Sequence, residues 1–328
     1  MSAQVAAQKI TGEFDLTRPP ESLWRDAWRR LLRNRVAVAG AIFIIIVTVA
    51  AIFADDGIIA WALGREPQQL LAPYDYEDVN FENARASPSL RRTAEGGFPH
   101  IFGTDKYGRD VFSRIIYGGR ISIAVGVICA LVIMIFGLAY GSVSGYLGGR
   151  ADTLMMRFVD IMYAFPTLLF IILIMVILGS TAGFVAVRNL VLAIGLVSWM
   201  STARLVRGQF LSLKEQEYVL AARMVGARDL AIIVRHLLPN SLGPIIVSIT
   251  LSIPGLIMFE ATLSFIGLGV PPPFPSWGQM LNEGWKAMRA NPHLIVFPAV
   301  MLSLIMLTFN FLGDGLRDAL DPQMRGTT

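Results

Sequence analysis

The sequence predicts an all-α membrane protein with six transmembrane helices and an amphipathic helix ahead of the first. Of its 328 residues, 54% are hydrophobic and 16% are charged, and the mean hydropathy is +0.57. Soluble domains carry about 25% charged residues, so this chain is too apolar for an ordinary soluble fold. Its net charge of +4 is too small to indicate a protein that binds nucleic acid.

Several classes of site are disfavoured by residue counts. Three His residues and a single Cys, Cys129, are too few soft ligands for a zinc or iron–sulfur site, and a lone thiol cannot close an internal disulfide. None of the Lys residues follows a Gly, so the phosphate-binding pattern G-x-x-x-x-G-K-[ST] is absent. We therefore expect a chain that has no cofactor of its own and does not itself hydrolyse ATP.

Six apolar runs are candidates to cross about 30 Å of hydrocarbon as helices that rise about 1.5 Å per residue. The fourth run, residues 190–203, is short, and the fifth, residues 242–266, contains Pro244, Pro254 and Glu260. Both therefore depend on burial by neighbouring helices. The third carries Asp160 near one end and Pro166 inside. The predicted spans are residues 36–53, 121–140, 158–178, 190–203, 242–266 and 294–312.

The first 35 residues are predicted to be a cytoplasmic tail and an elbow helix. Trp24, Trp28, Leu31 and Leu32 recur at helical spacing among five arginines, a pattern typical of a helix that lies in the lipid headgroup layer. A solvated basic tail is the alternative.

Charge then fixes the expected orientation, because Lys and Arg next to spans stay cytoplasmic. With six spans, the segments on the N-terminal side of the membrane hold more than half of the 28 Lys and Arg residues. Both termini are therefore expected in the cytoplasm. The remaining divisions are an extracytoplasmic loop at 54–120, a core domain at 121–316 that includes the cytoplasmic loop 204–240, and a cytoplasmic tail at 317–328.

The cytoplasmic segment 204–240 is half apolar, which an unstructured loop would not need. Ala221 and Ala222 allow close helix approach, Gly226 permits a sharp turn, and Pro239 is expected to end the second helical stretch. The segment therefore predicts a helix-turn-helix that presents a small-residue surface to a soluble partner.

A resemblance becomes specific here. Residues 217–240, EYVLAARMVGARDLAIIVRHLLPN, resemble the EAA loop of ABC-importer permeases, whose pattern is E-A-A, three residues, G, nine residues, I, one residue, L-P. Leu220 stands in place of the glutamate and His236 in place of the isoleucine, although RHLLPN resembles the form of the oligopeptide/dipeptide subfamily. The matching positions, with their spacing kept, are Ala221, Ala222, Gly226, Leu238 and Pro239.

Three further stretches look like the C-type permeases of peptide importers, so the resemblance covers most of the chain. They are FGTDKYGRDVFSRIIYGGRISIAVG at 102–126, EATLSFIGLGVPPPFPSWGQML at 260–281 and NFLGDGLRDALDP at 310–322.

The resemblance implies a type I ABC-importer permease of the bacterial cytoplasmic membrane that transports peptide-like solutes. It also implies a homologous second permease subunit, two cytoplasmic subunits that bind ATP and Mg, and an extracytoplasmic solute-binding protein. The residues expected to couple to the ATPase are Glu217, Tyr218, Ala221, Ala222, Gly226, Ala227, Arg228, Asp229, Leu238 and Pro239.

Several alternatives stay open. Glu260 lies within a span and is either a substrate or gating group or part of a buried structural network. Asp105, Arg109 and Asp110, near Arg114, are either a docking site for the binding protein or a self-paired, solvated surface. An ion-coupled secondary transporter is the rival class, and permeases for nickel or glutathione are the rival ABC permeases.

Overall fold

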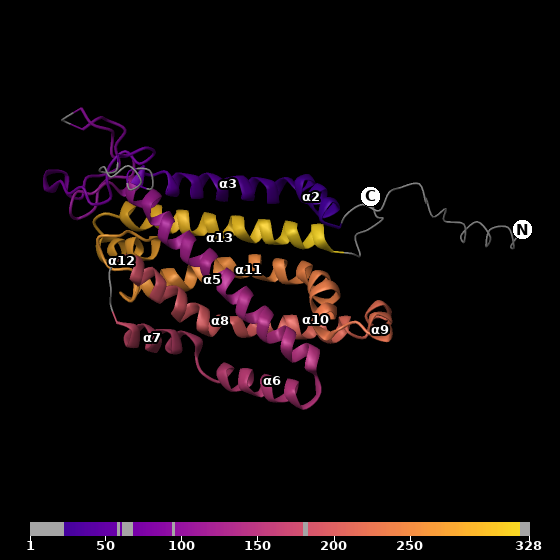
Figure 1. The fold of residues 1–328 in the computed structure, drawn as a ribbon. Helices are drawn as coiled ribbons and strands as arrows, with labels where there is room; N and C mark the ends of the chain where they lie inside the picture. The colour runs from indigo at the N-terminus through magenta and orange to yellow at the C-terminus, as the bar shows by residue number, and fades with distance from the viewer. Residues whose placement is uncertain (1–22, 58–59, 61–67, 94–95, 180–182, 322–328) are drawn as a thin grey trace, which may run out of the picture.

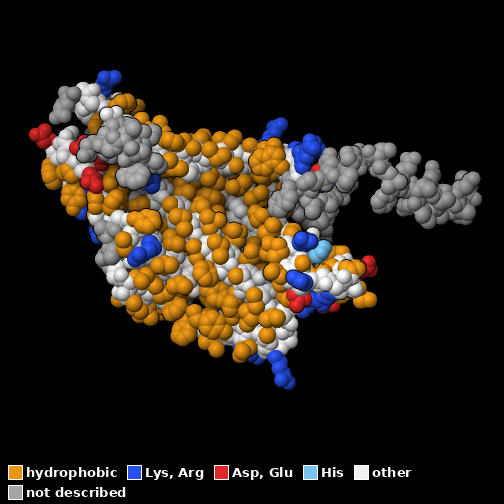
Figure 2. Space-filling model, in the orientation of Figure 1, with side chains coloured by type: hydrophobic (Ala, Val, Ile, Leu, Met, Phe, Trp, Pro, Cys, Tyr) orange, Lys and Arg blue, Asp and Glu red, His pale blue; other side chains and the backbone are white. Residues whose placement is uncertain are grey.

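The computed structural model describes residues 23–57, 60, 68–93, 96–179 and 183–321, and the regular secondary structure in these residues is helical. Five helices are long and apolar enough to cross a membrane, and a sixth crossing is present if one bent pair counts as a span. Hydrophobic side chains cover the middle of the visible face, and most charged ones lie toward its two ends (Figure 2). These features confirm the predicted all-α membrane class.

The predicted elbow helix and first span are both present, as α2 (Leu23–Arg33) and α3 (Arg35–Ile52). The Asn34 side chain separates them by accepting a 3.1 Å hydrogen bond from the backbone N–H of Ala37, which caps α3. In α2, Leu31 is buried against α3 and α13, whereas Trp28 and Leu32 are exposed. The helix therefore has the apolar outer face that the sequence pattern indicates.

A mostly irregular loop joins α3 to the next helix and contains one short 3-10 turn, η1 (Phe81–Asn83). Arg120 ties the loop's start to the bundle because it donates to the backbone oxygen of Ala51 and to both carboxylate oxygens of Asp55. Burial raises the pKa of Asp55, but the Arg120 hydrogen bonds and charge outweigh it, so this pKa lies below its ordinary value.

The second span is much longer than expected. Helix α5 (Val111–Leu147) begins ten residues before the predicted 121–140 span and continues seven residues beyond it. Asp110 caps its first turn by accepting a 2.7 Å hydrogen bond from the backbone N–H of Ser113. The loop predicted at 54–120 therefore ends at Asp110 in the structure.

The third predicted span, residues 158–178, is broken rather than continuous. Its residues belong to α6 (Gly149–Tyr163) and α7 (Thr167–Leu178), which meet at an angle of 83°. Pro166 lies directly before α7, where its missing N–H and fixed backbone angle suit a helix start and not a helix interior. The proline seen inside the predicted span is thus where the chain turns.

The fourth and sixth spans also exceed their predictions. Helix α8 (Gly183–Leu213) extends past Arg188 at one end and ten residues beyond Ala203 at the other. Helix α13 (His293–Leu320) continues past residue 312. Residues 317–320, at the start of the predicted C-terminal tail, are therefore helical. A helix that we did not predict, α12 (Trp277–Ala287), lies between α11 (Leu238–Phe265) and α13.

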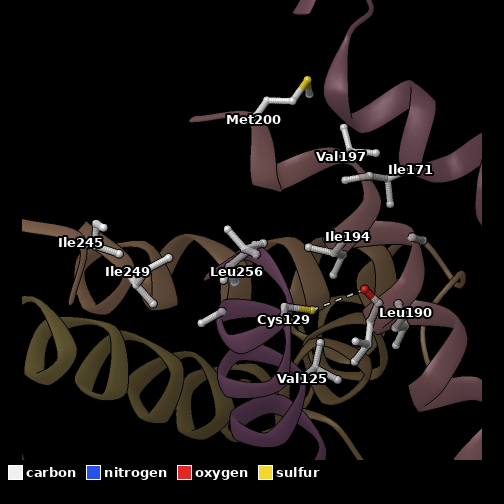
Figure 3. Close-up of a cluster of buried hydrophobic side chains, with 14 of the residues drawn as sticks. Val125, Cys129, Ile171, Leu190, Ile194, Val197, Met200, Ile245, Ile249 and Leu256 are labelled. Carbon is white, nitrogen blue, oxygen red and sulfur yellow. Dashed lines mark hydrogen bonds between the residues drawn. The ribbon is translucent and has the colours of Figure 1, made fainter. Parts of the chain in front are cut away.

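The core forms where α5 packs along α8. Gly137, Gly141 and Gly145 recur every four residues on α5, and a Cβ at any of them would collide with side chains or backbone of α8. This spacing of small residues allows close contact between membrane helices. Side chains of α5 such as Cys129 meet Leu190 and Ile194 of α8, with Leu256 of α11 nearby (Figure 3).

The helices run side by side between two distinct ends (Figure 1). One end carries α2, the C-terminal end of α13 and a short helix, α9 (Glu217–Met224). The opposite end carries the loop between α3 and α5 together with α12. Both described chain ends therefore lie at the same end as the loop that resembles the EAA motif.

Candidate functional site: the loop between α8 and α11

The loop folds as a helix followed by a sharp turn, as the sequence predicts. Gly226 has a φ of +78°, a conformation that favours glycine. Around it, the Gly226 N–H donates to the Arg223 carbonyl at 2.9 Å, and the Ala227 N–H donates to the Ala222 carbonyl at 3.0 Å. This pair of bonds is the Schellman arrangement that ends a helix with a left-handed residue.

Buried side chains on the inner side of α9 hold it to the bundle. Val219 is fully buried, and Ala222 and Ala227 are partly buried against the main core cluster. After the turn, α10 (Asp229–Ile232) buries Ile232 in the same cluster. Ala221, by contrast, is exposed, so only one of the two adjacent alanines lies at a close contact.

The outer side of this loop, which joins two candidate spans, carries several exposed apolar side chains. Met224 is 89% exposed, Val225 is 85% exposed and Leu230 is 72% exposed. Tyr218 and Leu220 add to the same apolar surface. We call Tyr218, Leu220, Met224, Val225 and Leu230 the α9 surface. Exposed apolar patches of this kind mark sites of protein–protein interaction.

Polar residues expected to couple to a partner remain accessible. Glu217, Arg228 and Asp229 are exposed, and Asp229 accepts a 2.5 Å hydrogen bond from the Tyr146 hydroxyl at the end of α5. The Arg223 guanidinium lies 5.7 Å from the centre of the Tyr146 ring. The turn after α9 is therefore attached to α5 as well as to its sequence neighbours.

Pro239 does not end a helix, contrary to the sequence prediction. Residues Ile233–Leu237 form a wide π-helical turn, η2, and the chain then continues directly into α11, with Pro239 in its first turn. A wider turn tolerates the missing proline N–H and the bulk of its ring. Leu238 packs against the core cluster, whereas Pro239 is exposed.

The arginines at the end of α8 are paired within the chain. Arg207 donates to both carboxylate oxygens of Asp152 on α6, at 2.5 and 2.6 Å. Ser144 also donates to Asp152, at 2.6 Å. Arg204 donates to Asp160 at 2.6 Å. These contacts attach α6 to α8 and leave neither arginine as a free cation for a partner.

Glu260 lies in a fully buried hydrogen-bond network where α5, α11 and α12 meet. Its carboxylate accepts hydrogen bonds from the hydroxyls of Ser122 at 2.8 Å and Ser264 at 2.7 Å. The Ser122 oxygen in turn accepts from the backbone N–H of Trp277, at 3.3 Å. Of the two interpretations left open by the sequence, this arrangement supports the structural network.

The residues considered for docking of a binding protein are buried, so a solvated surface is the wrong description. Asp105, Arg109 and Asp110 are each at most 5% exposed. Asp105 accepts from Arg109 at 2.7 Å and from Arg114 at 2.6 Å, and Arg114 also donates to Glu283 of α12 at 2.8 Å. They are self-paired, but within the protein.

Sequence reasoning missed Tyr146, Glu283 and α12. Glu283 lies 169 residues from Arg114, so no local pattern connects the two. A signal for α12 was present in Ser276, which caps the helix by accepting from the backbone N–H of Gln279 at 3.2 Å. No group of three or more His, Cys, Asp or Glu side chains suited to a metal ion occurs among the described residues.

An all-helical bundle with five or six candidate spans among the described residues defines the class of a multi-pass membrane protein. A family described as "Binding-protein-dependent transport system inner membrane component" matches residues 137–326, and "N-terminal TM domain of oligopeptide transport permease C" matches residues 22–88. The chain therefore belongs to the inner-membrane components of binding-protein-dependent transport systems. It is a non-catalytic permease subunit of an ABC transporter.

Curated relatives agree over almost the whole chain. The oligopeptide permease protein OppC of Bacillus subtilis is 42% identical and aligns over 93% of this chain and 91% of its own length. The dipeptide permease protein DppC of the same organism is 41% identical, covering 98% and 92%. The glutathione permease protein GsiD of Escherichia coli O157:H7 is 40% identical, covering 97% of each.

A solved structure supports the fold independently. The MetNI methionine ABC transporter, in an inward-facing form, aligns with 64% of this chain and 97% of its own chain, with a TM-score of 0.52 and 19% identity. Family membership removes the rival interpretation of an ion-coupled secondary transporter.

Proposed function

We propose that this permease forms half of the translocation pathway of an importer of di- and oligopeptides, and that the α9 surface docks on a cytoplasmic ATPase. A homologous permease would form the other half, two ATP-binding subunits would hold ATP and Mg, and an extracytoplasmic protein would deliver the solute. The chain would lie in the bacterial cytoplasmic membrane with both termini inside.

The observation that carries the docking proposal is the exposed apolar tip of the loop. Met224 and Val225 are among the most exposed large apolar residues of the described chain, yet they lie at the end of a helix that Val219 anchors to the bundle. An apolar tip on a rigid support is suited to insertion into a groove of a partner. Leu220, where the related pattern has glutamate, makes this contact more apolar.

The α9 surface is connected to two membrane-spanning helices. The turn after α9 continues through η2 into α11, and Asp229 is hydrogen-bonded to Tyr146 at the end of α5. Closure of the ATPases on ATP would therefore move α11 and α5 together with α9. Coupling requires the two conformations of the permease to differ in docking free energy.

The double substitution Met224→Asp with Val225→Asp is expected to weaken ATPase binding by about 30-fold or more, since two exposed anchors worth about 2 kcal/mol together are lost. Binding would be measured between the permease in nanodiscs and the purified ATPase. The control is Leu90→Asp with Phe98→Asp, because these residues are 82% and 65% exposed on the loop at the opposite end. Equal affinities for the wild type and the α9 double variant would contradict the proposal.

The peptide assignment is supported by relatives named for oligopeptide and dipeptide transport, while the glutathione relative is nearly as similar. In proteoliposomes holding the complete complex and its binding protein, di- and oligopeptides are expected to stimulate ATP turnover and to accumulate. Glutathione and nickel are the comparison solutes. Stimulation by glutathione or nickel alone would contradict the assignment and leave the docking proposal untouched.

A further inference from the structure

A cavity of about 580 Å³ opens at the end of the bundle opposite α9. Its walls come from the loop before α5, the first turn of α5, α12 with the segment that follows it, and the start of α13. The volume is in the range of sites that hold small molecules. This cavity is remote from the α9 surface and plays no part in the proposed docking of the ATPase.

The charge of the cavity wall is strongly basic. Five of its residues are Lys or Arg and two are acidic. The two acids, Asp105 and Glu283, both accept from the same Nη1 atom of Arg114, at 2.6 and 2.8 Å. Asp105 is further paired with Arg109. The negative charge of the wall is therefore already compensated within the protein.

Four basic side chains of the wall are not compensated in this way. Each is exposed, and none forms an ion pair with another of the residues that the structure describes. One of them, Lys106, lies over the Tyr107 ring at 4.5 Å and keeps its charge available. We call these four side chains the basic rim: Arg85, Lys106, Lys286 and Arg289.

Arg114 adds an unpaired edge behind the rim. Its side chain is 1% exposed, and its Nε and Nη2 atoms have no hydrogen-bond partner among the described residues. These two nitrogens form the side of the guanidinium that can donate two parallel hydrogen bonds to a carboxylate or phosphate. Protein atoms cover these two nitrogens, so an anion would first contact the basic rim. Side chains of the cavity wall would then have to move before the anion could reach Arg114.

The backbone at the rim is also unusual. Arg85 has a φ of +58° and is the single non-glycine residue with positive φ in the described part of the chain. Its backbone N–H is held by the Asp105 carbonyl at 2.8 Å. Left-handed conformations are unfavourable for residues with a Cβ, and strain of this kind concentrates at ligand sites.

We propose that this cavity binds an anionic oxygen group, a carboxylate or a phosphate, through the basic rim and the free edge of Arg114. Two sources supply this chemistry at this end of the molecule: the carboxylate of a peptide-like solute, and the phosphate of a lipid headgroup. Trp285, which lines the cavity and is 56% exposed, is a residue type suited to either the membrane interface or a solute.

The test uses the assembled complex, with cysteine-free partner subunits, in nanodiscs of zwitterionic lipid. Ala290→Cys would carry an environment-sensitive dye, since Ala290 is an exposed cavity residue and the native Cys129 is buried. Inorganic phosphate, alanyl-alanine and its C-terminal amide are titrated separately. We expect saturable dye responses to phosphate or to the free dipeptide, and none to the amide.

The deciding variant removes half of the rim, as Lys286→Gln with Arg289→Gln. Its apparent affinity for the anion is expected to fall by about tenfold or more. The matched control, Arg91→Gln with Arg92→Gln, removes two exposed charges from the same end of the molecule but outside the cavity, and should leave the affinity unchanged. Arg114→Lys keeps the charge that pairs Asp105 and Glu283, loses the two-donor edge, and should also weaken binding.

The two sources give different results. If phosphatidylglycerol in the nanodisc weakens the phosphate response by competition, the lipid headgroup is the source. If it has no effect and only the free dipeptide binds, the solute carboxylate is the source. The proposal is overturned if no probe gives a saturable response, or if the rim variant and its control bind the anion as the wild type does.

Discussion

Valine at position 226 is expected to leave the permease inserted in the membrane but to abolish productive coupling to its ATPase. Gly226 has a φ of +78°, and a Cβ added there would meet no heavy atom within 4 Å outside its own neighbourhood, so the cost is conformational rather than steric crowding. A left-handed residue with a Cβ costs about 1–2 kcal/mol, and a β-branched one costs more.

While the loop is not bound to the ATPase, the turn in the Gly226→Val variant can relieve this strain by changing its conformation. Docking then has to restore the strained conformation, which weakens binding. Loss of the left-handed residue breaks the bonds from Gly226 and Ala227 back to α9, which changes the angle between α9 and α10. The docked geometry then carries a penalty of about 1.4 kcal/mol or more, which is about tenfold in ATPase affinity. Transport should fall further, since each cycle needs the loop to transmit force.

Membrane level, ATPase affinity and solute uptake would be measured in parallel for Gly226→Val. The matched control is Gly208→Val on α8, because Gly208 also has open space around it but an ordinary helical backbone. Wild-type affinity and uptake in Gly226→Val would show that the turn is not required for coupling. Equal losses in both variants would point to a general effect of valine near the loop.

The parts of this protein that local sequence determines were predictable. Hydropathy located α3 closely, and the spacing around Gly226 predicted the turn, because both depend on residues within a few positions of each other. The ends of α5 were not predictable from hydropathy. Residues 111–120 contain arginines that are unsuited to a buried helix unless distant partners, such as Asp55 and Glu283, compensate their charge.

The same reason explains the description of Asp105 and Arg109 as a solvated surface. Alternating charges in a loop resemble a hydrated segment when the loop is considered alone. In the structure they are buried, and Arg114, which donates to Asp105, also donates to Glu283 of α12, a residue far away in the sequence. Pro166 shows a different limit: a proline inside an apolar run allows either a kinked span or a break, and neighbouring helices determine which forms.

Removing the Glu260 side chain, as in Glu260→Ala, is expected to cost about 3–5 kcal/mol of stability, because it leaves two buried hydroxyls without an acceptor and opens a cavity. Ser122 and Ser264 both donate to this carboxylate, and Ser122 also positions the start of α12 through Trp277. The apparent unfolding temperature in detergent should fall clearly. Met258→Ala, a truncation of an exposed neighbour on the same helix, should have little effect.

Glu260→Gln separates the structural role from a role for the charge. Glutamine keeps the shape and one acceptor oxygen, and a serine hydroxyl can rotate to accept from its amide. If Glu260 serves only the network among α5, α11 and α12, this variant should retain nearly wild-type stability and solute uptake. A stable Glu260→Gln variant without transport would instead assign Glu260 to gating or solute contact, because only the ionisable group would have been lost.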